Sequence, residues 1–158
     1  MELYLLRHAI AADAPPPGGS DADRALTADG IAKMKAAARG MRRLGIQPDV
    51  LLSSPLLRAQ QTAEIAAQEL GLEVALADEL TPGCDLAALA ALLRAHPRAS
   101  RPMIVGHEPD FSGLIRALTG GAAEMKKGGL ARIDADAIEP GAGRLIFLLP
   151  PRVLRAIG

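Results

Sequence analysis

Short apolar runs alternate along this chain with longer stretches in which apolar residues recur every three or four positions. The apolar runs Leu3 to Leu6, Val50 to Leu52 and Met103 to Val105 are typical of buried strands. The longer stretches between them predict amphipathic helices. Because strands that alternate with helices usually form a parallel sheet covered by those helices, the sequence predicts an α/β fold. We expect a three-layer sandwich with a central, mostly parallel sheet flanked by helices.

Local signals place the ends of the predicted helices. Caps with side-chain oxygens are expected at helix starts, and glycines are expected just beyond helix ends. A short strand is expected at 73–75, and residues 130–133 and 144–149 are expected to pair as antiparallel strands at one side of the sheet. The signals are, in chain order, Thr27 and Gly45 for the first helix, Ser54 with Pro55 and Gly71 for the second and Asp85 for the third, and a fourth helix is expected to begin at Asp110.

Composition restricts the class of protein further. A length of 158 residues suits one domain spanning 1–158, and 49% hydrophobic with 23% charged residues is ordinary for a folded, water-soluble protein. Eighteen Lys and Arg balance 18 Asp and Glu, and aromatic residues make up 2%, so neither nucleic acid nor a membrane is an expected partner. The single cysteine, Cys84, excludes an internal disulfide and a cysteine metal cluster. With no signal-peptide or membrane-spanning pattern, the expected location is the cytoplasm.

Polar residues follow the predicted strands at the points where the strands end. Arg7 and His8 follow the first strand, Ser53, Ser54 and Arg58 follow the second, and His107 follows the third. The carboxyl ends of parallel strands meet at one edge of a sheet, so we expect these groups to face one crevice. An arginine can direct two N–H donors onto phosphate oxygens, and an adjacent imidazole can attack phosphorus. The arrangement therefore indicates phosphate chemistry.

Each residue taken alone also has a structural interpretation. An Arg-His pair arises often by chance, and a lone histidine such as His107 is more often structural than catalytic. By spacing, Arg58 is also compatible with a solvated helix position or with an ion pair to Glu64 or another carboxylate. The set carries more information than any one of its members.

The order and spacing of these blocks resemble the histidine phosphatase superfamily, the phosphoglycerate mutase-like group. Within it, the chain is most similar to the small SixA-type phosphohistidine phosphatases. Ala9 departs from most of the superfamily, which has glycine after the Arg-His pair, although some SixA-type members share the alanine. The matching blocks are Leu-Leu-Arg-His-Ala near the start and those at residues 21–30, 53–63, 79–83 and 105–109.

The resemblance implies a role for each matched residue. His8 is expected to be the nucleophile, and Arg7 and Arg58 are expected to clamp the phosphoryl oxygens. His107 is expected to donate a further hydrogen bond to those oxygens, and Arg24 to lie near the phosphate. The resemblance implies neither a metal nor a cofactor. Cationic side chains would take the place that a metal ion occupies in other phosphoryl-transfer sites.

The general acid is the least defined part of this expected site. Glu79 is the best match, with Asp85 and Glu108 as weaker alternatives. An alkoxide leaving group needs a proton, whereas an imidazole is expelled more easily from a phosphorus–nitrogen bond, so a poorly defined acid favours phosphohistidine as substrate.

The expected function is hydrolysis of phosphohistidine on a protein partner through a covalent phosphohistidine on His8, with inorganic phosphate as product. Two alternatives stay open. One is a phosphatase of small phosphate esters, such as a sugar phosphate or a nucleotide, that uses the same mechanism. The other is a phosphate-binding module without turnover. The presence of His8 argues against the second.

Overall fold

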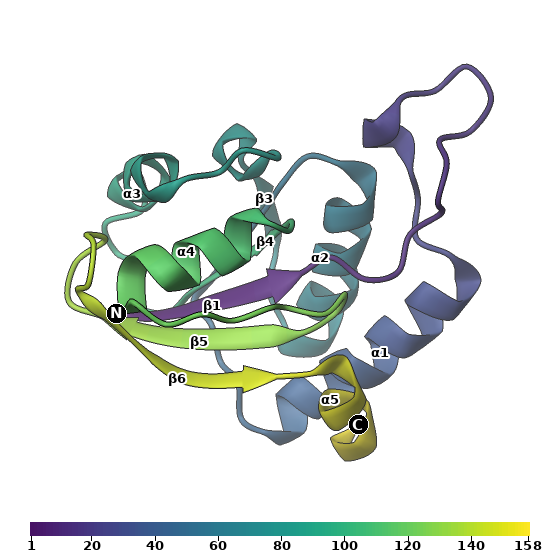
Figure 1. The fold of residues 1–158 in the computed structure, drawn as a ribbon. Coiled ribbons are helices and arrows are strands. Elements are labelled where there is room, and N and C mark those ends of the chain that lie inside the picture. Colours follow the sequence, from purple (N-terminus) through teal and green to yellow (C-terminus); the bar gives the residue numbers. More distant parts are fainter.

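A computed structural model describes residues 1–158 and is built around one six-stranded sheet in the order β3-β2-β4-β1-β5-β6 (Figure 1). The first four strands of the chain are parallel, and β5 and β6 are antiparallel to their neighbours at one side. This confirms the predicted α/β architecture. The strands are β1 (Glu2–Arg7), β2 (Val50–Ser53), β3 (Val74–Leu76), β4 (Pro102–Gly106), β5 (Leu130–Ala135) and β6 (Gly143–Leu149).

Helices cover both faces of the sheet and make it the middle layer of three (Figure 1). One face packs against α1, α2 and α5, and the other packs against α3 and α4. Side chains of β1 alternate between the two cores, with Tyr4 and Leu6 on the first face and Leu3 and Leu5 on the second. The helices are α1 (Ala28–Arg43), α2 (Leu57–Leu70), α3 (Leu86–Arg94), α4 (Asp110–Thr119) and α5 (Pro151–Ile157), with short 3₁₀ helices η1 (Asp21–Asp23) and η2 (Asp78–Leu80).

Several predicted helix ends are confirmed by their hydrogen bonds. The Thr27 hydroxyl accepts from the Gly30 amide at 2.9 Å, and the Asp85 carboxylate accepts from the Ala88 amide at 2.9 Å. Gly71 takes a left-handed conformation with φ of 71° just after α2, which glycine adopts without steric cost. None of the helices combines the length and the apolar character that a membrane crossing requires.

The predicted start of α2 is wrong. The helix begins at Leu57, after an N-cap at Leu56 that makes no side-chain bond, and not at Ser54. Ser54 instead continues the sheet, because its amide donates to the Val105 carbonyl at 3.0 Å. Its hydroxyl lies 2.8 Å from His107 Nε2. The Ser-Pro pattern therefore marks a residue just beyond the carboxyl end of β2 and not a helix cap.

The helix α5 was not predicted, and β3 lies one residue later than the expected 73–75. A seven-residue helix is too short to be stable without tertiary packing. In this protein α5 packs closely on α1, since a side chain at Gly40 would place its Cβ 2.0 Å from the Leu154 carbonyl oxygen. Contacts between distant parts of the chain, which no local pattern reveals, hold this helix.

Candidate active site

The sheet register brings the predicted polar residues to one edge. Arg7 is paired with Gly106 and Ser53 with Val105, so β1, β4 and β2 end at the same level. The His8 amide donates to the Gly106 carbonyl at 3.0 Å, one residue beyond the end of β1. The imidazole rings of His8 and His107 then lie with their centroids 5.3 Å apart. The predicted convergence of the strand ends is confirmed for these two histidines.

One ring nitrogen of His8 has a hydrogen-bond partner within the chain, and the other has none. Its Nδ1 lies 2.8 Å from the Ala9 carbonyl oxygen. Because a carbonyl only accepts hydrogen bonds, Nδ1 carries the proton and Nε2 keeps an unshared electron pair. Burial lowers the pKa of His8 to about 3; the bond to Ala9 opposes this, and His107, Arg58 and Arg7 lower it further. His8 is therefore neutral at pH 7.

The buried hydroxyl group of Thr62 links the backbone that follows β1 to helix α2. The Ala9 amide donates to Thr62 Oγ1 at 3.0 Å, and that hydroxyl donates to the Arg58 carbonyl at 2.7 Å. The Ala9 methyl group is buried in the core, so alanine fits at this position. Thr62 was not predicted to act here, although its place four residues after Arg58 puts the two on one helix face.

His107 is 3% exposed and has one partnered and one unpartnered ring nitrogen. Its Nε2 pairs with the Ser54 hydroxyl, and its Nδ1 has no hydrogen-bond partner. Burial lowers the pKa of His107 to about 4; Arg58 and Arg7 lower it further, and Asp21 opposes them. Both histidines of the site are thus uncharged at neutral pH.

Arg7 is anchored through a backbone carbonyl. Its Nη1 donates to the Met125 carbonyl oxygen at 2.6 Å, and its Nε is buried without a partner. Burial lowers the pKa of Arg7 from its ordinary value, while the nearby Glu108 and Glu124 oppose this. The Met125 amide in turn donates to Glu108 Oε1 at 3.1 Å. Glu108 therefore holds the segment that holds Arg7.

Arg58 and Arg24 meet on one carboxylate that the sequence analysis did not identify. Arg58 is 6% exposed and donates from Nη1 to the Asp21 carbonyl at 2.9 Å and from Nη2 to Asp21 Oδ2 at 3.0 Å. Arg24 donates from Nη1 to Asp21 Oδ1 at 2.8 Å and from Nε to the Ala12 carbonyl. The alternative in which Arg58 pairs with a carboxylate is correct, with Asp21 in place of Glu64. Hydrogen bonds from Arg24, with help from Arg58, hold the pKa of Asp21 below its usual range.

The three candidates for the general acid have different environments. Asp85 caps α3, and Glu108 accepts hydrogen bonds from Ser112 and Met125. Glu79 lies in η2, is exposed, and makes no hydrogen bond or ion pair within the chain. Of the three, only Glu79 has a carboxyl group with no structural partner. No group of three or more His, Cys, Asp or Glu side chains is arranged to hold a metal ion.

Buried nitrogen atoms without a hydrogen-bond partner mark this edge of the sheet. In the whole chain, two buried side-chain nitrogen or oxygen atoms lack a hydrogen-bond partner, and they are Arg7 Nε and His107 Nδ1. Buried polar groups are almost always paired, because leaving one unpaired costs about 1–3 kcal/mol. Both atoms belong to residues beside His8. Arg7 Nε is a donor, so an anion bound beside His8 would supply the acceptor that this atom lacks.

Comparison with known proteins gives the family. The model of the histidine phosphatase superfamily (branch 1) matches residues 3–81. The chain belongs to this superfamily. An uncharacterized protein of Picosynechococcus is 39% identical over 94% of this chain and 95% of its own length. The phosphohistidine phosphatase SixA of Escherichia coli is 29% identical over 77% of this chain and 76% of its own.

A solved structure supports the same family assignment and gives the fold. The protein histidine phosphatase SixA complexed with tungstate superimposes with a TM-score of 0.85 at 26% identity, covering 96% of this chain and 98% of that one. The sheet with its flanking helices is thus the histidine phosphatase fold. Membership of the superfamily supports phosphatase activity for this chain, with SixA among its near relatives.

Proposed function

We propose that residues 1–158 act as one domain that hydrolyses phosphohistidine on a protein partner through a covalent phosphohistidine on His8. The observation that carries the proposal is the presence, beside an unprotonated His8 Nε2, of two buried nitrogen atoms without a hydrogen-bond partner, Arg7 Nε and His107 Nδ1. A phosphoryl group placed against His8 would bring anionic oxygens to both. The names of the SixA relatives favour a phosphorylated histidine as the substrate.

The first step forms a bond between His8 Nε2 and phosphorus and breaks the phosphorus–nitrogen bond of the partner's phosphohistidine. The partner's imidazole leaves as a neutral ring when its other nitrogen carries a proton, so it makes little demand on a general acid. In the second step water attacks phosphorus and the bond to His8 breaks. Inorganic phosphate leaves, and the proton of the attacking water is released with the products. His8 returns to its starting state.

The surrounding cations balance the charge that stays on the phosphoryl oxygens during both steps. In this proposal Arg7, Arg58 and Arg24 bind those oxygens, and His107 donates one further hydrogen bond. No metal ion or cofactor takes part. Glu79 is the acid for any substrate with a poorer leaving group, since its carboxyl group has no structural partner. A small phosphate ester would therefore depend on Glu79 more than phosphohistidine would.

The proposal is tested with purified protein in EDTA, using a phosphohistidine-bearing protein and p-nitrophenyl phosphate as substrates. We expect rapid release of phosphate from the phosphoprotein, with an acid-labile phosphoryl group appearing transiently on the enzyme. His8→Ala should lower this turnover at least about a thousandfold and abolish the labile label. His96→Ala is the matched control, because His96 follows α3 and is the one histidine of the chain that lies outside the candidate site.

Three outcomes would redirect the assignment. Fast hydrolysis of the ester alone, lost in Glu79→Gln, would indicate a phosphatase of small esters. Full activity in His8→Ala would exclude the covalent mechanism. Binding of phosphate with no hydrolysis of either substrate would leave a phosphate-binding module.

A further inference from the structure

Ser54 makes the only hydrogen bond of the His107 ring. Its hydroxyl oxygen lies 2.8 Å from His107 Nε2, and the residue is 0% exposed. The Leu56 amide donates to the same oxygen at 3.3 Å. The hydroxyl group therefore sits between one N–H group and one ring nitrogen, with no access to water.

The position of the hydroxyl hydrogen follows from these contacts. The Leu56 amide has a hydrogen to give, so the oxygen accepts there. The hydroxyl hydrogen then needs an acceptor, and His107 Nε2 is the atom within reach. If Nε2 carried a hydrogen instead, the Ser54 hydroxyl would be a buried donor with no acceptor, which is rare and costly in folded proteins.

We infer that Ser54 is a positioning residue that donates its hydroxyl hydrogen to His107 Nε2 and so fixes the proton of His107 on Nδ1. The neutral ring then presents an N–H group at the one buried nitrogen that lacks a partner. The opposite tautomer would present an unshared electron pair there, which repels anionic oxygen. Ser54 would thus decide whether His107 attracts or repels a phosphoryl group.

A backbone hydrogen bond keeps the Ser54 hydroxyl in place, because the Ser54 amide donates to the Val105 carbonyl of β4 at 3.0 Å. The ends of β2 and β4 are therefore locked together, and His107 follows β4 directly. The low pKa of His107 makes the tautomer matter, because a ring that is neutral at pH 7 has a single N–H group.

The catalytic consequence rests on the proposed function, whereas the tautomer itself does not. Nitrogen-15 NMR of the histidine rings in phosphate-free buffer distinguishes a protonated from an unprotonated ring nitrogen. We expect the wild-type His107 to show hydrogen on Nδ1 and none on Nε2, with the signals assigned by comparison with His8→Ala and His96→Ala. A proton on Nε2 in the folded wild type would overturn the inference without any variant.

The consequence is measured with tungstate as an oxyanion probe. In Ser54→Ala we expect part of the His107 population to move its proton to Nε2 and the dissociation constant for tungstate to rise about tenfold. Ser53→Ala is the matched control, because that serine is equally buried and its hydroxyl serves a backbone carbonyl. It should leave both readouts unchanged. Circular dichroism confirms that each variant is folded.

The outcomes separate the two proposals. A folded Ser54→Ala variant with wild-type tautomer and wild-type tungstate affinity would refute the role of Ser54. Neither readout requires turnover, so a protein that hydrolyses no substrate would contradict the proposed function and leave the assignment of Ser54 intact. With an active enzyme, Ser54→Ala should lower kcat more than it raises KM, because the His107 contact strengthens as charge develops.

Discussion

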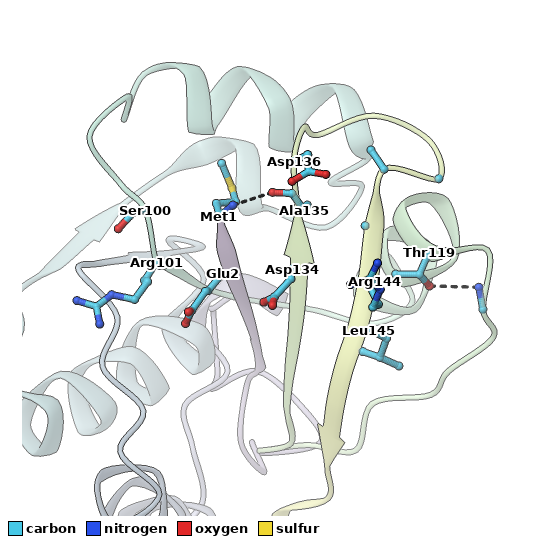
Figure 2. A pocket seen from close by; sticks show the side chains of 14 residues that line it. Met1, Glu2, Ser100, Arg101, Thr119, Asp134, Ala135, Asp136, Arg144 and Leu145 are labelled. Atoms are coloured by element: carbon cyan, nitrogen blue, oxygen red, sulfur yellow. Dashed lines mark hydrogen bonds between the residues drawn. The ribbon is translucent and has the colours of Figure 1, made fainter.

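The two ends of the sheet both carry charged side chains, yet only one of them leaves donors unpaired. At the amino end of β1, Arg132 bonds Asp134 at 2.7 Å and Glu2 at 3.1 Å, and the Met1 ammonium donates to the Ala135 carbonyl. A hollow lies at this amino end, and Figure 2 shows Glu2, Asp134 and Arg144 around it on three neighbouring strands. At the carboxyl end, two histidines and Arg58 are buried, and Arg7 Nε and His107 Nδ1 have no hydrogen-bond partner.

The two largest hollows described here and the unpartnered nitrogen atoms lie in different parts of this protein. The hollow at the amino end measures about 900 Å³, and it is lined by side chains that are paired or in contact with water. A second hollow of about 710 Å³ lies between α3 and α4, lined largely by apolar and small residues. Arg7 and His107, which carry the unpartnered nitrogen atoms, line neither hollow. A buried donor without a partner costs free energy, and in the proposed mechanism an oxyanion bound at Arg7 Nε would relieve that cost.

The largest difference in activity between the two ends is expected when one arginine is removed at each of them in turn. We expect Arg58→Ala to lower kcat/KM for phosphohistidine by about 10²–10³, because a buried cation contacts the charge that develops in the transition state. Arg144→Ala, at the rim of the amino-end hollow, should stay within about twofold of wild type, as surface substitutions usually do. Steady-state kinetics measures both, and thermal unfolding checks that Arg58→Ala is folded. Equal losses in the two variants would remove the functional distinction between the ends.

The second prediction concerns stability against acid. The pKa values of His8 and His107 in the folded protein, about 3 and about 4, lie below the unfolded value of about 6.5. Below about pH 6.5 the unfolded chain therefore binds protons that the folded chain does not, so stability falls as pH falls. From pH 7 to pH 5 the two histidines should lower the free energy of unfolding by on the order of 3–4 kcal/mol.

Urea unfolding in phosphate-free buffer at the two pH values measures this loss. The double variant His8→Gln with His107→Gln should lose correspondingly less stability over the same interval. No histidine lines the amino-end hollow, so the histidine contribution belongs to the carboxyl end. An identical pH dependence in wild type and double variant would show that the two rings are not held neutral by burial.

General rules predicted that Arg7, His8 and His107 lie at one end of the sheet, whereas Arg24 was expected near the phosphate only from the resemblance to the histidine phosphatase superfamily. His8 and His107 follow apolar runs, and parallel strands end at one edge of a sheet. The partners of these residues follow no such rule. Arg7 bonds a backbone carbonyl 118 positions away, and carbonyls have no sequence signature. Ser54 was predicted to be a helix cap because Pro55 follows it, and although its oxygen does accept the Leu56 amide, the helix begins only at Leu57.

The loop before α1 shows a second limit of sequence reasoning. Asp21 lies 37 positions from Arg58 and follows a proline- and glycine-rich segment without periodicity. Nothing local tells which of the acidic residues in that loop meets a distant arginine. Only the folded chain shows that Asp21 and not Asp23 takes that place, since Asp23 bonds the backbone and side chain of Ser20.

The smallest expected effect comes from the same substitution at the two ends. Asp21 and Asp134 are both exposed enough to be screened by water, and each bonds an arginine at 3.0 Å or less. Asp21, however, occupies donors of Arg58 and Arg24 that are proposed to bind the phosphoryl oxygens. Its negative charge competes with an arriving anion. Asp134 pairs with Arg132 near the amino end of β1, where no anion is expected to bind.

We therefore expect Asp21→Asn to lower the dissociation constant for tungstate about three- to fivefold, an effect within the range of exposed ion pairs. Asp134→Asn should leave tungstate binding unchanged and cost at most about 1 kcal/mol of stability, because water screens the pair. Isothermal titration calorimetry at low and high salt measures the binding, and the gain in Asp21→Asn should shrink as salt rises. Weaker binding in Asp21→Asn would mean that this carboxylate orients Arg58 and Arg24 for the anion and does not compete with it.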